Sequence, residues 1–355
     1  MGSAAMTTPL TDILAARIRA DGPISMSSYM AECLLHPTHG YYTTRDPFGA
    51  AGDFTTAPEI SQMFGEMLGL CMAQAWMEQG RPSRFILAEL GPGRGTLMAD
   101  VLRVGRAVPG FVEAAQVVFV EASEVLRRAQ ATRVPDAKWV DSVDQIPADA
   151  PLFLLANEFF DALPIRQFQR QQVDWAEVCV GLDADGTLQL TLRPAPGAVP
   201  GRHSDTQPGG IVELCPALPG IVAEVAARVA DGGCAIIVDY GDWRSLGDTV
   251  QALRAHTPEP ILAAPGAADL TAHVDFEAIA QAANGQASAM IPQGVLLERL
   301  GITTRAQTLA KGLTGAALDA HIAAHRRLTH PDEMGHLFKA IALGPKGGPF
   351  PPGFV

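Results

Sequence analysis

The sequence predicts an α/β protein with a Rossmann-like, doubly wound parallel sheet. After residue 85, apolar runs of strand length alternate with helical patterns. These runs are nearly continuous in apolar residues, as expected of parallel strands that are covered on both faces. The first run leads into a glycine-rich turn, and each run ends in a polar residue at the carboxyl edge, where such sheets bind ligands.

The N-terminal 80 residues are predicted to be helical and to precede the sheet. Helices are expected over 11–20 and 27–35, the second stopped by Pro37. A long third helix is expected over 58–79, where apolar residues recur at helical spacing. The loops between these helices are rich in turn formers, aromatic residues and polar residues.

The first predicted strand, 85–90, contains Glu89 and meets the turn Gly91-Pro92-Gly93-Arg94-Gly95, which opens a helix over 95–104. Such a turn lets the backbone approach a nucleotide closely. A dinucleotide fingerprint would place Gly or Ala where Thr96 stands, and a phosphate-binding loop would need a nearby Lys. An acid before the turn suits a cofactor without phosphates, such as S-adenosylmethionine (SAM). An ordinary glycine-rich turn is the alternative.

Further strand ends supply candidate cofactor ligands. The predicted elements are strands over 117–120, 139–140, 152–156 and 234–238, and a helix over 123–132. Glu121 ends the second strand and could accept hydrogen bonds from both ribose hydroxyls of SAM or NAD. Asp141 and Ser142 end the third strand and could reach an adenine amino group. A solvated acid at a strand end remains the alternative for Glu121.

The loop after the fourth strand holds the candidate catalytic residues Asn157, Glu158 and Asp161. In doubly wound methyltransferases this loop faces the transferred methyl group. Asn157 can present a carbonyl oxygen to an amine, and acids in so apolar a loop are rarely left unpaired. A helix cap with acids in its first turn explains Asp161 equally well, but Glu158 less well.

Two more places could face a substrate. Asp53, Thr55 and Thr56 precede the long third helix, where a capping role is equally plausible. His273 could act as a base oriented by Asp275, although a packing role is favoured. His36 and His39 lack the Cys or third His of a metal site, so no metal is expected.

Two stretches interrupt the alternation of strands and helices. Residues 165–215 read as an antiparallel excursion, residues 242–275 as an insertion, and 337–343 as a final strand. The expected domains are a helical N-terminal cap (1–82), a core (83–164 and 211–345, with the insertion 242–275), a β-rich insertion (165–210) and a tail (346–355).

Composition restricts the partners. The formal net charge is −12 without a Lys/Arg cluster, which disfavours nucleic acids and favours a cationic protein segment. Five scattered cysteines without a C-x-x-C pair indicate free thiols in a reducing compartment. No apolar run approaches the ~18 residues of a membrane span, and no secretory signal is visible.

Several long segments resemble the MidA-type family of SAM-dependent methyltransferases, and the resemblance covers most of the chain, from about residue 24 to 343. The matching segments begin at Gly52-Asp-Phe-Thr-Thr-Ala-Pro-Glu, Glu89-Leu-Gly-Pro-Gly-Arg-Gly-Thr, Asn157-Glu-Phe-Phe-Asp-Ala-Leu-Pro, Asp239-Tyr-Gly, Ala268-Asp-Leu-Thr-Ala-His-Val-Asp-Phe and Met334-Gly-His-Leu-Phe-Lys. The family includes the mitochondrial assembly factor of respiratory complex I that methylates a protein arginine.

The resemblance implies a Rossmann-like methyltransferase core with a helical N-terminal region and a β-rich insertion. It implies SAM as the methyl donor and a protein arginine, possibly on a complex I subunit, as the acceptor. For a chain this rich in Ala and Gly, a bacterial cytoplasmic location is expected, with the mitochondrial matrix as its eukaryotic equivalent. The alternatives are a non-catalytic SAM-binding assembly factor and an NAD-dependent oxidoreductase; Thr96 weighs against the latter.

Overall fold

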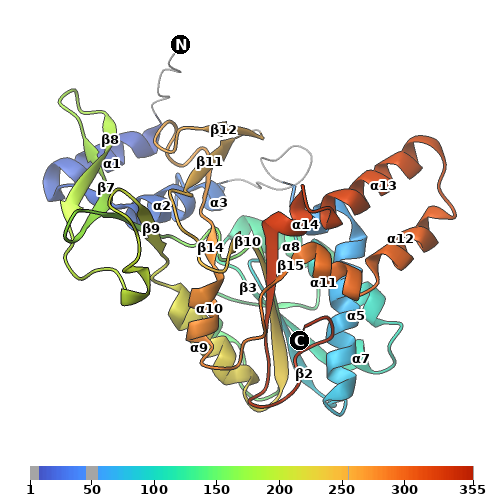
Figure 1. Ribbon diagram of the computed structural model, residues 1–355. Helices are drawn as coiled ribbons and strands as arrows, with labels where there is room; N and C mark the ends of the chain where they lie inside the picture. The colour runs from blue at the N-terminus through green and yellow to red at the C-terminus, as the bar shows by residue number, and fades with distance from the viewer. Residues whose placement is uncertain (1–7, 45–54, 255, 355) are drawn as a thin grey trace.

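The predicted strands pair into an eight-stranded core sheet. The computed structural model describes residues 8–44, 55–254 and 256–354, and Figure 1 shows the arrangement of its elements. Across the sheet the order is β15 (Ile291–Pro292), β16 (Phe338–Leu343), β10 (Gly233–Asp242), β5 (Leu152–Asn157), β2 (Phe85–Leu90), β3 (Ala115–Val120) and β4 (Lys138–Val140), with β14 (Val274–Asp275) paired to β10.

The central strands β10, β5, β2, β3 and β4 are parallel, while β16 runs antiparallel to β10. Strand β2 lies between β3 and β5, so the order of the strands along the chain reverses between β2 and β5. In doubly wound sheets, ligands bind in the crevice at the carboxyl ends of the strands at this switch point. The glycine turn after β2 and the loop after β5 therefore emerge side by side.

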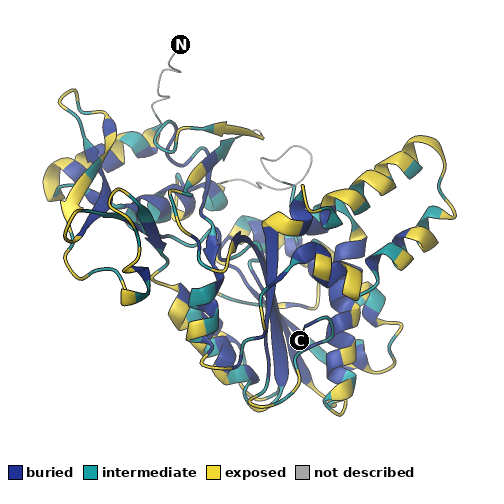
Figure 2. Ribbon diagram, viewed as in Figure 1, coloured by how far each residue is buried: buried dark blue, intermediate teal, exposed yellow. Residues whose placement is uncertain are grey.

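Helices cover both faces of the core sheet. Alternate strand residues face opposite sides, so Phe85 and Phe153 join one apolar cluster, whereas Ile86 and Leu154 join another. The first cluster includes α5 (Gln62–Glu78), α6 (Thr96–Gly105) and α11 (Gln293–Arg299); the second includes α9 (Leu218–Val229) and α10 (Phe276–Ala282). Figure 2 shows the sheet as the most deeply buried part of the molecule.

The long helix predicted over 58–79 is interrupted, so that prediction is wrong in one respect. Ser61 is extended (φ −161°, ψ 137°) and separates α4 (Ala57–Ile60) from α5. Its Oγ accepts a hydrogen bond from the Met63 backbone N–H at 3.2 Å, which caps α5. The break places α4 at the carboxyl edge of the sheet.

An antiparallel five-stranded sheet confirms the excursion predicted over 165–215. It contains β6 (Arg166–Arg170), β7 (Trp175–Leu182), β8 (Leu188–Pro194) and β9 (Ile211–Leu214), together with β1 (Ile24–Ser25) from the N-terminal region. Helices α1 (Pro9–Asp21), α2 (Met26–Leu35) and α3 (Tyr41–Thr44) lie beside it, and residues of all three share an apolar cluster with β7. The N-terminal region therefore packs partly here and, through α5, partly on the core sheet; the domain boundaries remain a proposal.

Eight further helices and strands complete the described chain. They are α7 (Phe111–Ala114), α8 (Glu124–Arg133), the antiparallel strands β11 (Gln251–Arg254), β12 (Thr257–Glu259) and β13 (Asp269–Thr271), and the C-terminal helices α12 (Ile302–Ala310), α13 (Gly315–Thr329) and α14 (Met334–Leu337). Short 3-10 turns occur at Val143–Gln145 and Gly201–His203. None of the helices described here is long and apolar enough to cross a bilayer.

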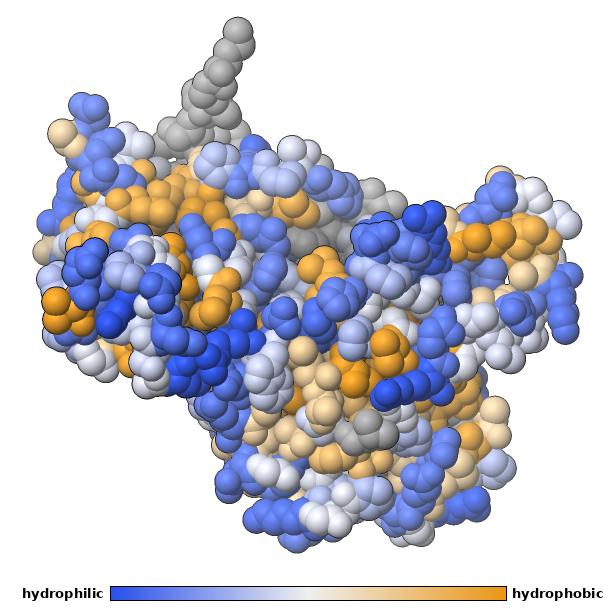
Figure 3. Space-filling view, in the orientation of Figure 1, coloured by the Kyte–Doolittle hydropathy of each residue, from blue (hydrophilic) through white to orange (hydrophobic). Residues whose placement is uncertain are grey.

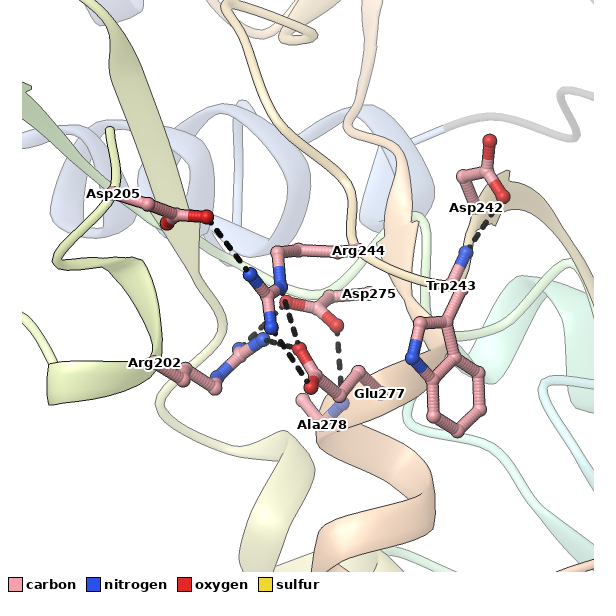
Figure 4. Close-up of polar contacts among 8 residues, drawn as sticks. All are labelled: Arg202, Asp205, Asp242, Trp243, Arg244, Asp275, Glu277 and Ala278. Atoms are coloured by element: carbon pink, nitrogen blue, oxygen red, sulfur yellow. Dashed lines mark hydrogen bonds and ion pairs between the residues drawn. The ribbon is translucent and has the colours of Figure 1, made fainter. Parts of the chain in front are cut away.

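A network of ion pairs ties the β-rich part to the core (Figure 4). Arg202, beside β9 in the insertion, bonds to Asp275 at 2.6 Å and to Glu277 at 2.7 Å, both at the start of α10. Arg244 bonds to the same Glu277 at 2.8 Å. The bonds from Arg244 and Arg202 lower the pKa of Glu277 to about 2. The carboxylate thus stays charged and fixes the orientation of the two parts.

Candidate active site

The turn after β2 uses backbone conformations that favour glycine. Gly91, Gly93 and Gly95 have φ of +58°, +53° and +77°. A Cβ atom on Gly91 would lie 2.9 Å from Cδ2 of Phe159, so glycine also lets the loop after β5 pack against this turn. The expected strand, turn and helix are confirmed, with Gly95 as the N-cap of α6.

A cavity of about 310 Å³ opens at this turn. Its floor and walls include Gly91, Gly93, Glu121 and Glu158 from the core sheet edge. Its remaining walls come partly from α2 and α3, through Leu34, Leu35, Tyr42 and Thr43. The N-terminal helices therefore complete a site that the core alone would leave open.

Glu121 is held by groups that the sequence did not reveal. Its carboxylate accepts hydrogen bonds from the Ser123 backbone N–H (2.7 Å) and from Nε2 of Gln130 (3.1 Å). Gln130 is fully buried, and its Nε2 also donates to the Gly93 carbonyl at 2.8 Å, while Trp139 Nε1 donates to its Oε1 at 2.7 Å. Burial raises the pKa of Glu121, and the bonds from Ser123 and Gln130 oppose that rise. Gln130 thus links the glycine turn to the predicted ribose acid.

Asp141 and Ser142 also line this cavity, at the end of β4. The Asp141 side chain is 73% exposed and its Oδ1 accepts a hydrogen bond from Arg127 at 2.6 Å. One oxygen of the Asp141 carboxylate is thus already bonded to Arg127. Ser142 and the nearby backbone are therefore equally good candidates to bind an adenine amino group.

Glu158 lies where the cofactor cavity meets a second, smaller hollow. Its backbone is left-handed (φ +51°), which is unusual for a residue other than glycine. Its Oε1 accepts hydrogen bonds from the Ala57 backbone N–H (3.1 Å) and from Nδ2 of Asn157 (3.0 Å). Burial raises the pKa of Glu158 to about 7. Oδ1 of Asn157 is buried without a hydrogen-bond partner among the described residues.

Asp239 anchors the loop that carries Glu158. Its side chain is fully buried in the C-terminal half of β10, and its Oδ2 accepts hydrogen bonds from the backbone N–H groups of Phe159 (3.2 Å), Phe160 (2.9 Å) and Asp161 (3.3 Å). Burial and the nearby Glu158 raise the pKa of Asp239 to about 8. The motif Asp239-Tyr240-Gly241 was visible in the sequence, but nothing there indicated this partner.

The second hollow, about 40 Å³ in size, is lined by three acids and one base, Arg94, and is called the acidic hollow below. Glu59 from α4 and Glu89 from β2 line it together with Glu158. Oγ1 of Thr96 donates to Glu59 at 2.5 Å, so the residue that departs from the dinucleotide pattern joins α6 to α4. Glu89 is 3% exposed, its Oε2 has no hydrogen-bond partner in the described chain, and burial raises its pKa to about 8. Sequence reasoning missed Glu59.

The structure separates the other candidates from this centre. Asp161 is buried behind the loop, where burial and then Asp239 raise its pKa well above the usual range, and it lines neither cavity. His273 lines a different cavity of about 360 Å³ between the β-rich part and α10. Thr56 borders the acidic hollow, whereas its neighbour Thr55 does not line it. Asp53 lies outside the described residues.

The residues present fit SAM. The cavity is large enough for a small cofactor, its glycine turn lets a ligand approach the backbone, and a buried carboxylate, Glu121, lines it at the end of β3, where a ribose acid is predicted. The orphan oxygen of Glu89 could bind a cationic group of the ligand or of a substrate. Among the described residues, no group of three or more His, Cys, Asp or Glu side chains is arranged to hold a metal ion.

Comparison with known proteins agrees with this geometry. Residues 67–294 match a family described as S-adenosyl-L-methionine-dependent methyltransferase. The chain is 37% identical to Protein arginine methyltransferase NDUFAF7, mitochondrial, of Danio rerio (93% of this chain, 85% of the relative) and 35% identical to that of Homo sapiens (95% and 84%).

A solved structure agrees over the whole length. A Burkholderia thailandensis protein bound to S-adenosyl-homocysteine (SAH) superposes with a TM-score of 0.82 at 27% identity, covering 99% of this chain and 96% of that one. These likenesses favour SAM over NAD and set the oxidoreductase alternative aside. The chain belongs to the MidA-type family of SAM-dependent methyltransferases, and its cofactor is SAM.

Proposed function

We propose that the chain transfers the methyl group of SAM to an arginine side chain of a protein, and that this protein is a subunit of respiratory complex I. The relatives named protein arginine methyltransferase support the acceptor type. The observation that carries the proposal is the meeting of Glu59, Glu89 and Glu158 beside the cofactor cavity. The Glu59 and Glu158 carboxylates suit a cation such as guanidinium, and Glu89, whose pKa burial raises to about 8, offers a further hydrogen-bonding group beside them.

A guanidinium group is a poor nucleophile because it is positively charged, with a pKa above 12. The Glu158 carboxylate would accept hydrogen bonds from two nitrogens of the guanidinium group and hold the positive charge on them. The third guanidinium nitrogen would then be directed at the methyl group. SAM supplies a methyl group bonded to a sulfonium sulfur. The Asn157 Oδ1, buried and unpaired among the described residues, can accept a further N–H of the acceptor. The protein's main contribution is thus alignment.

Glu158 is also suited to take up a proton. Transfer of a methyl group to guanidinium releases one proton from the nitrogen that is methylated. Burial holds the pKa of Glu158 near 7, and a base of that pKa works best close to neutral pH. The same shift requires that activity rises with pH as Glu158 ionises, because only the carboxylate can bind the cation or accept the proton.

The chain's own residues favour catalysis over a role confined to SAM binding. A protein that only bound the cofactor would have no use for Glu158 in a strained backbone conformation where the two cavities meet. Nor would it need the buried anchor Asp239, which holds that conformation in place.

Replacement of Glu158 tests the proposal. The Glu158→Gln variant keeps the size of the side chain and removes its charge, so we expect SAH to bind within about three-fold of the wild-type Kd. Methyl transfer to an arginine-containing partner should fall about 100-fold or more, by analogy with the loss of other groups that act in the transition state. Calorimetry and the mass shift of the partner, measured on one preparation, give the two values.

Glu213→Gln is the matched control, because Glu213 is also a buried acid with a raised pKa but lines the separate cavity. Its transfer rate should stay near that of the wild type. Wild-type transfer should also increase between pH 6 and 8, as the pKa of Glu158 near 7 requires. If the Glu158→Gln variant transferred methyl groups at the full rate, either another acid would bind the acceptor or the acceptor would not be an arginine.

The complex I acceptor is tested separately. Complex I purified from cells with and without this chain should differ in one methylated arginine, detected by mass spectrometry. We place the protein in the bacterial cytoplasm, as its composition suggested, whereas the named relatives are mitochondrial. An unchanged methylation pattern would exclude complex I as the acceptor but not arginine.

A further inference from the structure

The C-terminal helices α12 and α13 form a hairpin, here called the arm (residues 302–330), that extends from the core (Figure 1). Of the fifteen residues of α13, only Leu328 is buried, and Figure 2 shows this helix as mostly exposed. Ile322, near its middle, is 56% exposed. Orange residues in Figure 3 mark apolar surface on the arm. Helices usually gain their stability by burying an apolar face, but α13 joins the apolar core only through Leu328, near its end.

Buried polar contacts hold the arm in place. Arg305 of α12 donates two hydrogen bonds, of 2.6 and 2.9 Å, to Glu66 of α5, which also accepts one from Arg103 at 2.7 Å. The Glu66 side chain is 1% exposed; burial alone would raise its pKa, but the bonds from Arg305 and Arg103 prevail and lower it. Within the hairpin, His325 bonds to Thr303 at 3.0 Å. The arm is therefore positioned without being covered.

The base of the arm lies at the acidic hollow. The C-terminal part of α13 packs near α4, the short helix that supplies Glu59 and donates the Ala57 N–H to Glu158. Arg327, in the last turn of α13, is close enough to Glu158 to favour its charged form electrostatically. When an arginine of a partner protein enters the hollow, the residues beside that arginine would thus contact α13.

The arm has the opposite charge to the rest of the chain. It contains four Lys or Arg residues and one Asp, a net charge of +3, whereas the whole chain carries −12 and the remainder therefore −15. Arg305 pairs with Glu66, and Arg326 pairs with Glu333 at 2.9 Å. In the described part of the chain, Lys311 and Arg327 have no carboxylate within ion-pair distance.

We propose that the arm docks the protein acceptor, and that this acceptor carries acidic residues near the arginine to be methylated. The proposal rests on the proposed arginine transfer. The acidic hollow receives the guanidinium group, Arg327 and Lys311 bind the acidic flank, and Ile322 supplies an apolar contact between them. Helix α13 is about 22 Å long at 1.5 Å per residue, so the acidic residues lie within about seven extended residues of the arginine.

Peptide binding tests the proposal without requiring turnover. The probes are fluorescent 20-residue peptides with one arginine and four Glu residues, placed before it in one peptide and after it in the other. Each acidic peptide has a neutral control peptide, in which the four Glu residues are replaced by Gln. With SAH present, we expect one acidic peptide to bind the full-length protein about ten-fold more tightly than its Gln counterpart at low salt, and the difference to shrink in 0.5 M salt.

The variants Lys311→Glu and Arg327→Glu should each remove most of that difference. The control is Lys346→Glu, since Lys346 is also exposed but lies after β16, at the opposite end of the sheet, where its N–H bonds to Ala230. Lys311→Glu and Lys346→Glu should keep wild-type SAH affinity and wild-type methylation of the Gln peptides. Equal binding of acidic and Gln peptides, or an undiminished preference in Lys311→Glu, overturns the proposal.

Two further outcomes separate the arm from the proposed function. If the acidic peptide binds through the arm but its arginine is never methylated, the docking proposal stands and the acceptor type is wrong. If arginine is methylated equally whether its flank is acidic or neutral, the acceptor type is right and the docking proposal is wrong. The Ile322→Glu variant tests self-association: should it convert a dimer into monomers in sedimentation, the arm is an interface between two copies, and the docking proposal fails.

Discussion

Single residues at the cofactor cavity combine unusual backbone conformations with buried charge. The glycine turn adopts left-handed φ values without steric cost, whereas Glu158 adopts one as a bulkier residue. That conformation costs on the order of 1–2 kcal/mol. Its persistence here is consistent with five hydrogen bonds that hold Glu158 and its loop: two that Glu158 accepts from Ala57 and Asn157, and three that Asp239 accepts from the loop backbone.

Gly93 is a first test at this scale. In Gly93→Val, a β-branched side chain would occupy a left-handed position on the wall of the cofactor cavity. We expect SAH binding to be lost in calorimetry while the protein stays folded by circular dichroism. Gly80→Val is the control, because Gly80 has φ +86° with no atom near its missing Cβ; it carries similar strain but should bind SAH normally. A folded Gly93→Val protein with normal affinity would contradict the cavity assignment.

Glu121 is a second test. In Glu121→Ala the ribose loses a charged acceptor, and each such hydrogen bond contributes about 1.5–3 kcal/mol. We expect the Kd for SAH to rise roughly ten-fold or more. Glu124→Ala removes an acid three residues away that is 74% exposed, and its Kd should be unchanged. Equal Kd values for the two variants would limit Glu121 to a structural role, as the buried partner of Ser123 and Gln130.

At the scale of elements, the carboxyl edge of the sheet brings together pieces that are distant along the chain. The break at Ser61 turns α4 into a separate element, whose Ala57 N–H reaches Glu158. Asp239 in the C-terminal half of β10 reaches the loop after β5, because Val238 of β10 pairs with Asn157 of β5 in a parallel register. The loop conformation is thus set by a neighbouring strand.

The Asp239→Asn variant tests this positioning role. An amide cannot serve all of the N–H donors that the carboxylate accepts from Phe159, Phe160, Asp161 and Tyr240. We expect kcat for methyl transfer to fall about ten-fold or more as Glu158 loses its fixed orientation, while the Kd for SAH changes by less than about three-fold.

The separation of these two values is the informative part of the experiment. A purely structural role for Asp239 would lower the folded fraction and reduce both activity and SAH binding sites in proportion. Titration of the number of binding sites on the same preparation distinguishes the cases. An unaltered kcat would show that Glu158 keeps its place without Asp239.

For the whole molecule, the buried acids of the active site make stability depend on pH. Burial raises the pKa of Glu89 to about 8, far above its value in the unfolded chain. The folded state therefore binds more protons than the unfolded state, and the free energy of unfolding decreases as pH rises towards 8. The two histidines with lowered pKa values, His203 and His273, act in the opposite direction, because the unfolded state binds more protons there, but their effect fades above their ordinary pKa of about 6.5.

The ligand-free protein should accordingly lose stability between pH 7 and 8, by on the order of 1 kcal/mol from Glu89 alone. Denaturant unfolding measures this loss. The Glu89→Gln variant should lose less over the same interval, with Asp239 accounting for part of what remains, since its pKa is also raised to about 8. Parallel pH profiles for the variant and the wild type would contradict a buried, protonated Glu89.

Much of the core was predictable because its signals are local. Continuous apolar runs at 85–90, 117–120 and 152–156 predicted strands that the structure confirms, and the glycine turn predicted the nucleotide-approach element. The helix over 58–79 was predicted without its break, because apolar periodicity continues across Ser61 and outweighed its capping signal. The arm was not predicted, since α13 has no continuous buried face to produce a pattern.

The sequence by itself predicted the fold class and the strand ends, because each depends on a pattern within a short segment, and its resemblance to the MidA-type family implied the cofactor. Only the tertiary structure decided which acids meet. It brought Glu59 and Glu89 to Glu158, placed His273 at a separate cavity and buried Asp161 behind the loop. Strand order and register determine such contacts between distant segments, and so do the buried hydrogen bonds of Gln130 and Asp239, whose partners no local pattern specifies.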